Sequence, residues 1–108
     1  MKKYKLKVFT LKTCPHCASF KTNLKNENIQ FADSVCEEDP KSCDKIEAIT
    51  GSEEYPMVML EADSKSYAIY QTSNHSDLGE KEIDNKGIYK IACHSIDNML
   101  FVIKKVLY

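Results

Sequence analysis

Apolar and polar residues follow different spacings along the first third of the chain. Residues 4–11 alternate apolar side chains with lysines and then become apolar throughout, which predicts a strand that enters a core. Ala18, Phe20 and Leu24 lie at near-helical spacing, so we expect a helix that begins at or near Cys14. Residues 29–35 are typical of a second strand.

The clearest helix signal follows that strand. Asp39 suits an N-cap, Pro40 suits the first helical position and Gly51 suits the C-terminal cap. Between these ends, Ile46 and Ile49 would face inward. We therefore expect a second helix from about residue 40 to residue 50.

The second half of the chain predicts a hairpin, a long connection and a final helix. Residues 57–61 and 66–71 read as two strands joined by a short polar turn. Residues 72–90 are polar and contain a turn signal, so we expect a long loop that could include a short strand or a helical turn. Residues 96–107 form one continuous apolar stripe at helical spacing, with Ser95 as N-cap, and we expect this stripe to face the core.

This order of elements predicts one α/β domain that covers residues 1–108. An early strand–helix–strand unit followed by a hairpin and a closing helix indicates a mixed sheet. The length of 108 residues is typical of a single domain.

Charge and hydropathy narrow the range of partners. The formal net charge is −1, so nothing indicates a broad attraction for nucleic acid or for anionic membranes. The first residues lack the continuous apolar stretch of a signal peptide, and no run of about 18 apolar residues is present. We expect a monomeric cytoplasmic protein without a membrane or nucleic-acid partner.

Five cysteines carry the candidate chemistry, and two of them are only two residues apart. Cys14 and Cys17 stand at the expected start of the first helix, with Pro15 and His16 between them. In a reducing compartment such cysteines are more often catalytic or metal-binding than part of a disulfide scaffold. The pair therefore either exchanges electrons or holds a metal.

The position of the pair favours electron exchange. The positive end of a helix dipole and its free backbone N–H groups stabilise a thiolate, so Cys14 is the candidate nucleophile. Cys17 lies one turn further on and can attack a mixed disulfide formed at Cys14. Pro15 fixes the geometry of the first turn, His16 tunes the pair as a protonated or hydrogen-bond-donating imidazole, and Lys12 adds nearby positive charge. We expect a rather oxidising pair.

Two alternatives concern the remaining cysteines. Cys36 and Cys43 could join Cys14 and Cys17 in a structural zinc site, although a C-x6-C spacing departs from the usual zinc knuckle, so we assign no metal ligand. Cys36 and Cys43 could instead form a second redox pair, or they could be half-buried thiols without a redox role. Cys93, next to a lone histidine, has no identifiable catalytic partner.

Three features resemble the thioredoxin superfamily, and glutaredoxins most closely. The segment FTLKTCPHC resembles the strand and CPxC motif of glutaredoxins, which typically carry CPYC. The segment YPMVML matches the proline that precedes a strand about forty residues later, and the element order is similar along nearly the whole chain. The resemblance implies a thioredoxin-like fold, with the four predicted strands in a central mixed sheet flanked by about three helices.

The resemblance also implies an activity and a substrate site. It implies a thiol–disulfide oxidoreductase whose Cys14–Cys17 pair exchanges with protein disulfides or with glutathione mixed disulfides. Pro56 matches the cis proline of the family, and the backbone of Tyr55 would meet the substrate.

The glycine pair that binds glutathione in the family is missing here. Ser76 and Asp77 stand in its place as candidate ligands. Glutathione is therefore a possible cosubstrate, and we expect no bound cofactor. A fold of this kind could also serve as a redox-inert adaptor for a partner protein.

Overall fold

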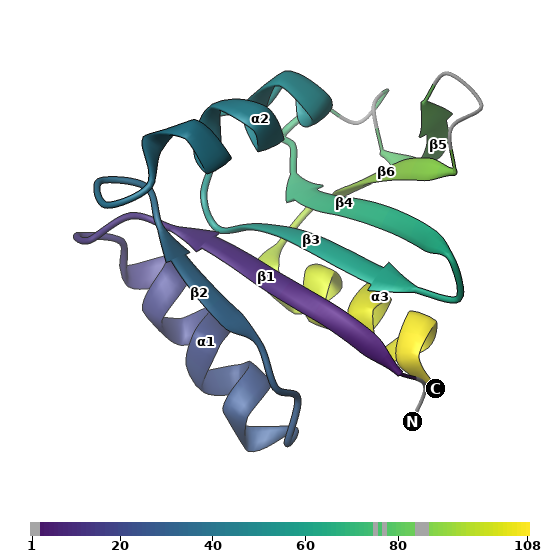
Figure 1. Cartoon of the computed structure of the whole chain (residues 1–108), viewed down its shortest axis with the longest axis horizontal. Coiled ribbons are helices and arrows are strands. Elements are labelled where there is room, and N and C mark those ends of the chain that lie inside the picture. Colours follow the sequence, from purple (N-terminus) through teal and green to yellow (C-terminus); the bar gives the residue numbers. More distant parts are fainter. Residues whose placement is uncertain (1–2, 75, 77, 84–86) are drawn as a thin grey trace.

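The computed structural model describes residues 3–74, 76, 78–83 and 87–108 (Figure 1). Within these residues, six strands form one mixed sheet in the order β2-β1-β3-β4-β6-β5. The strands are β1 (Tyr4–Thr10), β2 (Ala32–Val35), β3 (Met57–Ala62), β4 (Lys65–Gln71), β5 (Gly79–Ile83) and β6 (Ile88–Cys93). The helices are α1 (Pro15–Asn26), α2 (Pro40–Thr50) and α3 (Ile96–Leu107).

The directions of the strands place several chain connections at one edge of the sheet. β1 runs parallel to β2 and antiparallel to β3, and the last residues of β1 and β2, Thr10 and Val35, are register partners. β3 begins where β1 ends, because the two strands are antiparallel with Phe9 opposite Met57. The loops after β1 and β2 and the segment before β3 therefore meet at this edge.

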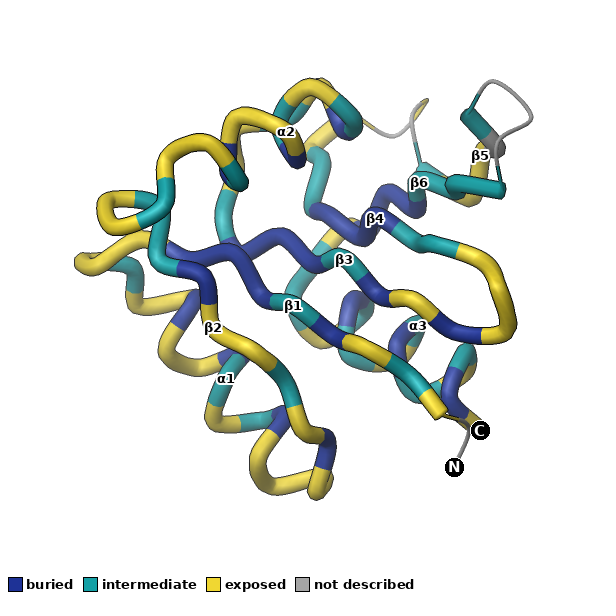
Figure 2. Tube along the Cα trace, viewed as in Figure 1, coloured by how far each residue is buried: buried dark blue, intermediate teal, exposed yellow. Residues whose placement is uncertain are grey.

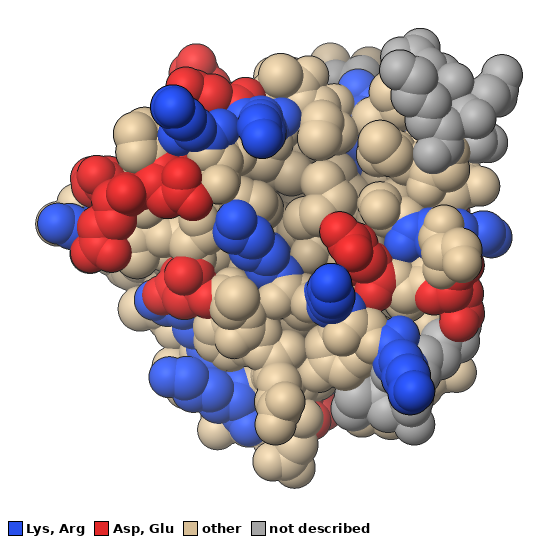
Figure 3. All heavy atoms as spheres, in the orientation of Figure 1, with Lys and Arg blue, Asp and Glu red and all other residues tan. Residues whose placement is uncertain are grey.

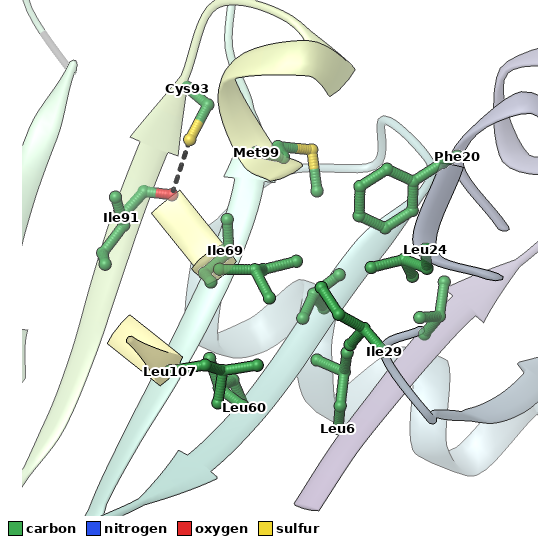
Figure 4. Close-up of a cluster of buried hydrophobic side chains, with 13 residues drawn as sticks. Leu6, Phe20, Leu24, Ile29, Leu60, Ile69, Ile91, Cys93, Met99 and Leu107 are labelled. Atoms are coloured by element: carbon green, nitrogen blue, oxygen red, sulfur yellow. Dashed lines mark hydrogen bonds between the residues drawn. The ribbon is translucent and has the colours of Figure 1, made fainter. Parts of the chain in front are cut away.

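The helices cover the two faces of the sheet unequally. α1 and α3 lie on one face, and α2 crosses one end of the other face (Figure 1). The larger core cluster lies between the sheet, α1 and α3, and Figure 4 shows its side chains, including Phe20, Leu24, Ile69, Met99 and Leu107. A smaller cluster lies beneath α2 and includes Phe9, Ile46 and Met57. In Figure 2, many of the buried residues, drawn in dark blue, lie along the central strands of the sheet.

The helix ends agree with the capping residues expected from the sequence. The carboxylate of Asp39 accepts a hydrogen bond from the Ser42 N–H at 3.4 Å, and Gly51 takes the left-handed conformation (φ 72°) that ends α2. The Ser95 side chain caps α3 by accepting from the Asn98 N–H at 3.1 Å. Both helices therefore begin and end where their sequence predicts.

The sheet corrects one expectation, because the described residues form six strands rather than four. Much of the segment expected to be a long loop is a β-hairpin, in which β5 pairs antiparallel with β6. β6 in turn pairs parallel with β4, and the stacked rings of Tyr67 and Tyr89 lie 5.6 Å apart across that pair. Ile91 and Cys93 extend the core cluster toward α3, which explains why β6 joins the sheet.

None of the helices in the described part of the chain is both long enough and apolar enough to cross a membrane.

Candidate functional site

The cysteine pair stands at the junction of β1 and α1. Cys14 is the N-cap of α1 in an extended conformation, and Pro15 occupies the first helical position. The Cys17 N–H donates to the Cys14 Sγ at 3.1 Å, so the sulfur takes the place that a capping oxygen usually fills. The two cysteines form a disulfide, with their Cα atoms 5.2 Å apart. The pair is thus built into the first turn of the helix.

Access to the two sulfurs is unequal. Cys17 is buried, with 1% of its surface exposed, whereas Cys14 is partly exposed. An incoming thiol or disulfide therefore reaches Cys14 first. This asymmetry suits one cysteine that meets the substrate and a second that acts from inside the protein.

The segment before β3 lies against Cys14. The carbonyl oxygen of Tyr55 is 3.9 Å from the Cys14 Sγ, and the Tyr55–Pro56 bond is cis, as the family resemblance implied. The Tyr55 hydroxyl donates to a carboxylate oxygen of Glu47 on α2 at 2.5 Å. Burial raises the pKa of Tyr55 above its usual value, and the neighbouring Glu47 carboxylate raises it further. The phenol therefore stays protonated and holds this segment to α2.

A polar group at the end of β1 fixes the base of the Cys14 loop. Thr10 is 1% exposed, and its hydroxyl donates to Asp33 on β2 at 2.8 Å. The Lys21 ammonium on α1 lies 2.7 Å from the other oxygen of Asp33. Burial alone would raise the pKa of Asp33, but the hydrogen bonds from Lys21 and Thr10 outweigh burial and lower it. This group ties β1, β2 and α1 together immediately below the loop.

Cys36 and Cys43 form a second disulfide, with their Cα atoms 5.6 Å apart. Cys36 follows β2 directly, and its N–H donates to the carbonyl oxygen of Thr10 at 2.8 Å. The four cysteines considered for a zinc site are thus joined as two separate pairs. In the part of the chain that the structure describes, no group of three or more His, Cys, Asp or Glu side chains is arranged to hold a metal ion.

Comparison with known families adds an independent observation. The glutaredoxin family model matches residues 6–64, more than half of the chain, from β1 to the turn between β3 and β4. The chain belongs to the glutaredoxin family. A search of curated proteins found no match.

Family membership and the CPHC disulfide together indicate a thiol–disulfide redox function and a thioredoxin-like fold. The matched region of this glutaredoxin family member includes both disulfides and the cis proline. The β5–β6 hairpin and α3 lie beyond the matched residues.

The residues expected to tune Cys14 are at the surface. Lys12 and His16 are exposed, and among the described residues neither side chain makes a hydrogen bond or an ion pair with the Cys14 sulfur. The backbone of Lys12 has a specific contact instead, because its N–H donates to both carboxylate oxygens of Glu37, at 3.2 and 3.3 Å. Any effect of these two side chains on Cys14 would act through space.

Within the described residues, the structure does not connect the candidate glutathione ligands, Ser76 and Asp77, to the CPHC segment. Ser76 is exposed and bonds to the Asn74 side chain through its N–H (3.1 Å) and its hydroxyl (2.8 Å), with no hydrogen bond to a described residue of the CPHC segment. Asp77 lies outside the described residues. Their proposed role in binding glutathione stays a prediction.

Sequence reasoning missed three acidic residues of this site: Asp33, Glu37 and Glu47. Asp33 and Glu37 act on partners more than twenty positions away in the chain, so no local motif marks them. The one signal that could have indicated them was the predicted pairing of two parallel strands, because parallel strands bring the residues at their ends together.

Proposed function

We propose that the chain is a thiol–disulfide oxidoreductase in which Cys14 attacks the substrate and Cys17 resolves the mixed disulfide. One observation carries this assignment. The partly exposed Cys14 sulfur caps α1 and accepts the Cys17 N–H, while the Cys17 sulfur is buried directly behind it.

The reduction proceeds in two exchanges. The Cys14 thiolate attacks one sulfur of a substrate disulfide, forms a mixed disulfide and releases the other sulfur as a thiolate. Cys17 then loses its proton to solvent and attacks the Cys14 sulfur. The Cys14–Cys17 disulfide forms and the second substrate thiolate leaves, so that two electrons pass from the protein to the substrate. The oxidising direction runs through the same steps in reverse.

The protein environment supports the thiolate of Cys14. The N–H groups of the first turn of α1 and the positive end of the helix dipole favour a negative charge at the N-cap. We propose that the positive charge of Lys12 and the imidazole of His16, protonated or acting as a hydrogen-bond donor, add to this effect and make the pair more oxidising.

The backbone before β3 is the proposed substrate site. Its support is the position of the Tyr55 carbonyl, 3.9 Å from the Cys14 Sγ, next to the cis bond to Pro56. An extended peptide or the backbone of glutathione could pair with the backbone groups at this position. We propose that the substrates are protein disulfides or glutathione mixed disulfides, exchanged by a monomer in the cytoplasm.

The assignment is tested with single cysteine variants assayed on both substrate classes. Cys14→Ser is expected to abolish turnover of a protein disulfide and of a glutathione mixed disulfide. Cys17→Ser is expected to accumulate a mixed disulfide at Cys14, detected by intact mass. Cys93→Ser, which changes a buried cysteine in the core, is the control and should keep the wild-type rate. A Cys14→Ser protein that turns over at the wild-type rate would contradict the assignment.

A further inference from the structure

The second disulfide lies at the same edge of the sheet as the CPHC segment. Because β1 and β2 are parallel and end in register at Thr10 and Val35, the loops that leave them begin side by side. Each of these loops carries a disulfide that connects it to the first turn of the following helix. One edge of the sheet therefore holds two cysteine pairs.

We propose that Cys36–Cys43 is a second redox-active pair, reduced by an external dithiol, and that its state controls the reactivity of Cys14. The alternative is a disulfide that serves only to hold the fold together. Access, the leaving group and the contacts of the loop support the redox role.

Access to the two sulfurs repeats the asymmetry of the first pair. Cys36 is partly exposed, whereas Cys43 is 3% exposed and belongs to the cluster beneath α2 with Phe9 and Ile46. An attacking thiolate therefore reaches Cys36 and expels Cys43. Cys43 is the fourth residue of α2, where the positive end of the helix stabilises a departing thiolate.

A dithiol can reduce the Cys36–Cys43 disulfide in two successive thiol–disulfide exchanges. One thiolate of the dithiol attacks the Cys36 Sγ, the Cys36–Cys43 bond breaks, and Cys43 leaves as a thiolate that takes a proton from solvent. The second thiol of the reductant loses its proton and attacks the reductant's sulfur in the mixed disulfide, which releases Cys36. The cysteine pair gains two electrons and the dithiol becomes a disulfide.

A direct contact connects this pair to the active-site loop. Glu37, next to Cys36, accepts the N–H of Lys12, which is two residues before Cys14. Glu37, Glu38 and Asp39 all lie between the two bridged cysteines. Figure 3 shows acidic atoms gathered at the left, over the segment between β2 and α2.

The disulfide restrains the backbone that positions Glu37. Opening it removes the link between Cys36 and α2. Backbone hydrogen bonds from Cys36 to Thr10 and from Glu38 and Asp39 to Val35 still hold the turn, and we expect the Glu37 side chain to be the part that loosens from Lys12. Because a nearby negative charge disfavours a thiolate, loss of this carboxylate should make Cys14 more reactive. We therefore expect Cys14 to react faster when the second pair is reduced than when it is oxidised.

The redox role is tested in the Cys14→Ser/Cys17→Ser protein, where the first pair cannot contribute. The protein is equilibrated with mixtures of reduced and oxidised dithiothreitol, and its free thiols are then labelled with a maleimide and counted by intact mass spectrometry. Circular dichroism monitors the fold in the same mixtures. We expect a reversible change of two thiols in folded protein. A pair that opens only when the protein unfolds, or that never closes, would overturn the proposal. This test is independent of the function proposed for Cys14.

The coupling is tested in a Cys17→Ser background, which leaves Cys14 free to react with iodoacetamide. With the second pair oxidised, and at a pH below the pKa of Cys14, Glu37→Gln should raise the alkylation rate of Cys14 several-fold because more of the thiol is ionised. Reduction of the second pair, or Cys36→Ser/Cys43→Ser, should raise it similarly. Glu38→Gln is the matched control, because Glu38 is exposed and its side chain makes no hydrogen bond within the described residues, and should leave the rate unchanged. Equal rates in all of these proteins would refute the coupling.

Discussion

Cys93 differs from the four paired cysteines because it is a free thiol, buried in the larger core cluster. Its exposed fraction is 0%, and its Sγ lies 4.0 Å from the carbonyl oxygen of Ile91. A dashed line marks this contact in Figure 4. Burial raises the pKa of Cys93 to about 11. Since only the thiolate is nucleophilic, this cysteine is a core side chain rather than a reactive one.

We predict that Cys93 resists alkylation in the folded protein. After complete reduction, iodoacetamide at pH 8 should label Cys14 readily and leave Cys93 unlabelled, whereas both should be labelled in urea. Peptide mass mapping of the two samples measures this difference. Labelling of Cys93 in the native sample at a rate like that of Cys14 would show that the core opens around it.

Asp33 should make stability depend on pH at the acidic end. Its pKa is lowered in the folded state, so its contribution is fully present above its ordinary value of 3.8 and is lost as the pH falls through the lowered pKa. We predict that Asp33→Asn is less stable than the wild type at pH 6 and that the difference shrinks toward pH 2. Urea unfolding at several pH values measures it. A difference that does not change with pH would contradict the role of the charge.

Local sequence patterns identified the CPHC cysteines and the cis proline but not the residues that support them. Cys14, Cys17 and Pro56 stand in short segments whose chemistry can be read directly, and the structure brings Cys14 next to the residue before Pro56. Asp33 and Glu37 reach this site only because β1 and β2 end in register. That register depends on the packing of the whole sheet and leaves no mark near either residue.

Among the elements, the helices were predictable and the last two strands were not. Asp39, Gly51 and Ser95 act on backbone groups a few residues away, so a local pattern is sufficient to place them. β5 is an edge strand whose residues Gly79–Lys81 are exposed, so it lacks the apolar alternation that reveals a strand. The alternation of Tyr89, Ile91 and Cys93 was the signal that could have identified β6.

We predict that α3 stabilises the fold through one face only. Ile103→Ala should lower the free energy of unfolding by about 3 kcal/mol, because Ile103 is 0% exposed and its loss leaves a cavity. Phe101→Ala is the control on the same helix, and a change of about 0.5 kcal/mol or less is expected because Phe101 is 63% exposed. Urea unfolding of both variants distinguishes the faces. Equal losses would contradict the observed packing.

For the molecule as a whole, the chemistry is concentrated at one edge of the sheet and the larger core lies behind it. Both disulfides and the segment before β3 meet at this edge, while α1 and α3 pack on a single face. The four paired cysteines are not part of the larger cluster, so we expect this cluster to stay in place when the pairs open or close.

We predict that the Cys36–Cys43 disulfide contributes to stability without being required for folding. It closes a short loop, so Cys36→Ser/Cys43→Ser should unfold about 2 kcal/mol more easily than the oxidised wild type. The comparison uses urea unfolding with the first pair oxidised in both proteins. Failure of the double variant to fold would show that the bridge is indispensable and would also conflict with reversible opening.

The two outer strands of the sheet have a consequence for association between molecules. β2 has four residues and β5 has five, and the latter carries Glu80 and Lys81. A long, flat, apolar border would invite another chain to extend the sheet and nucleate aggregates, and short charged borders discourage this. The repeated opening of the sulfur bridges that we propose would therefore not present a template for fibril growth.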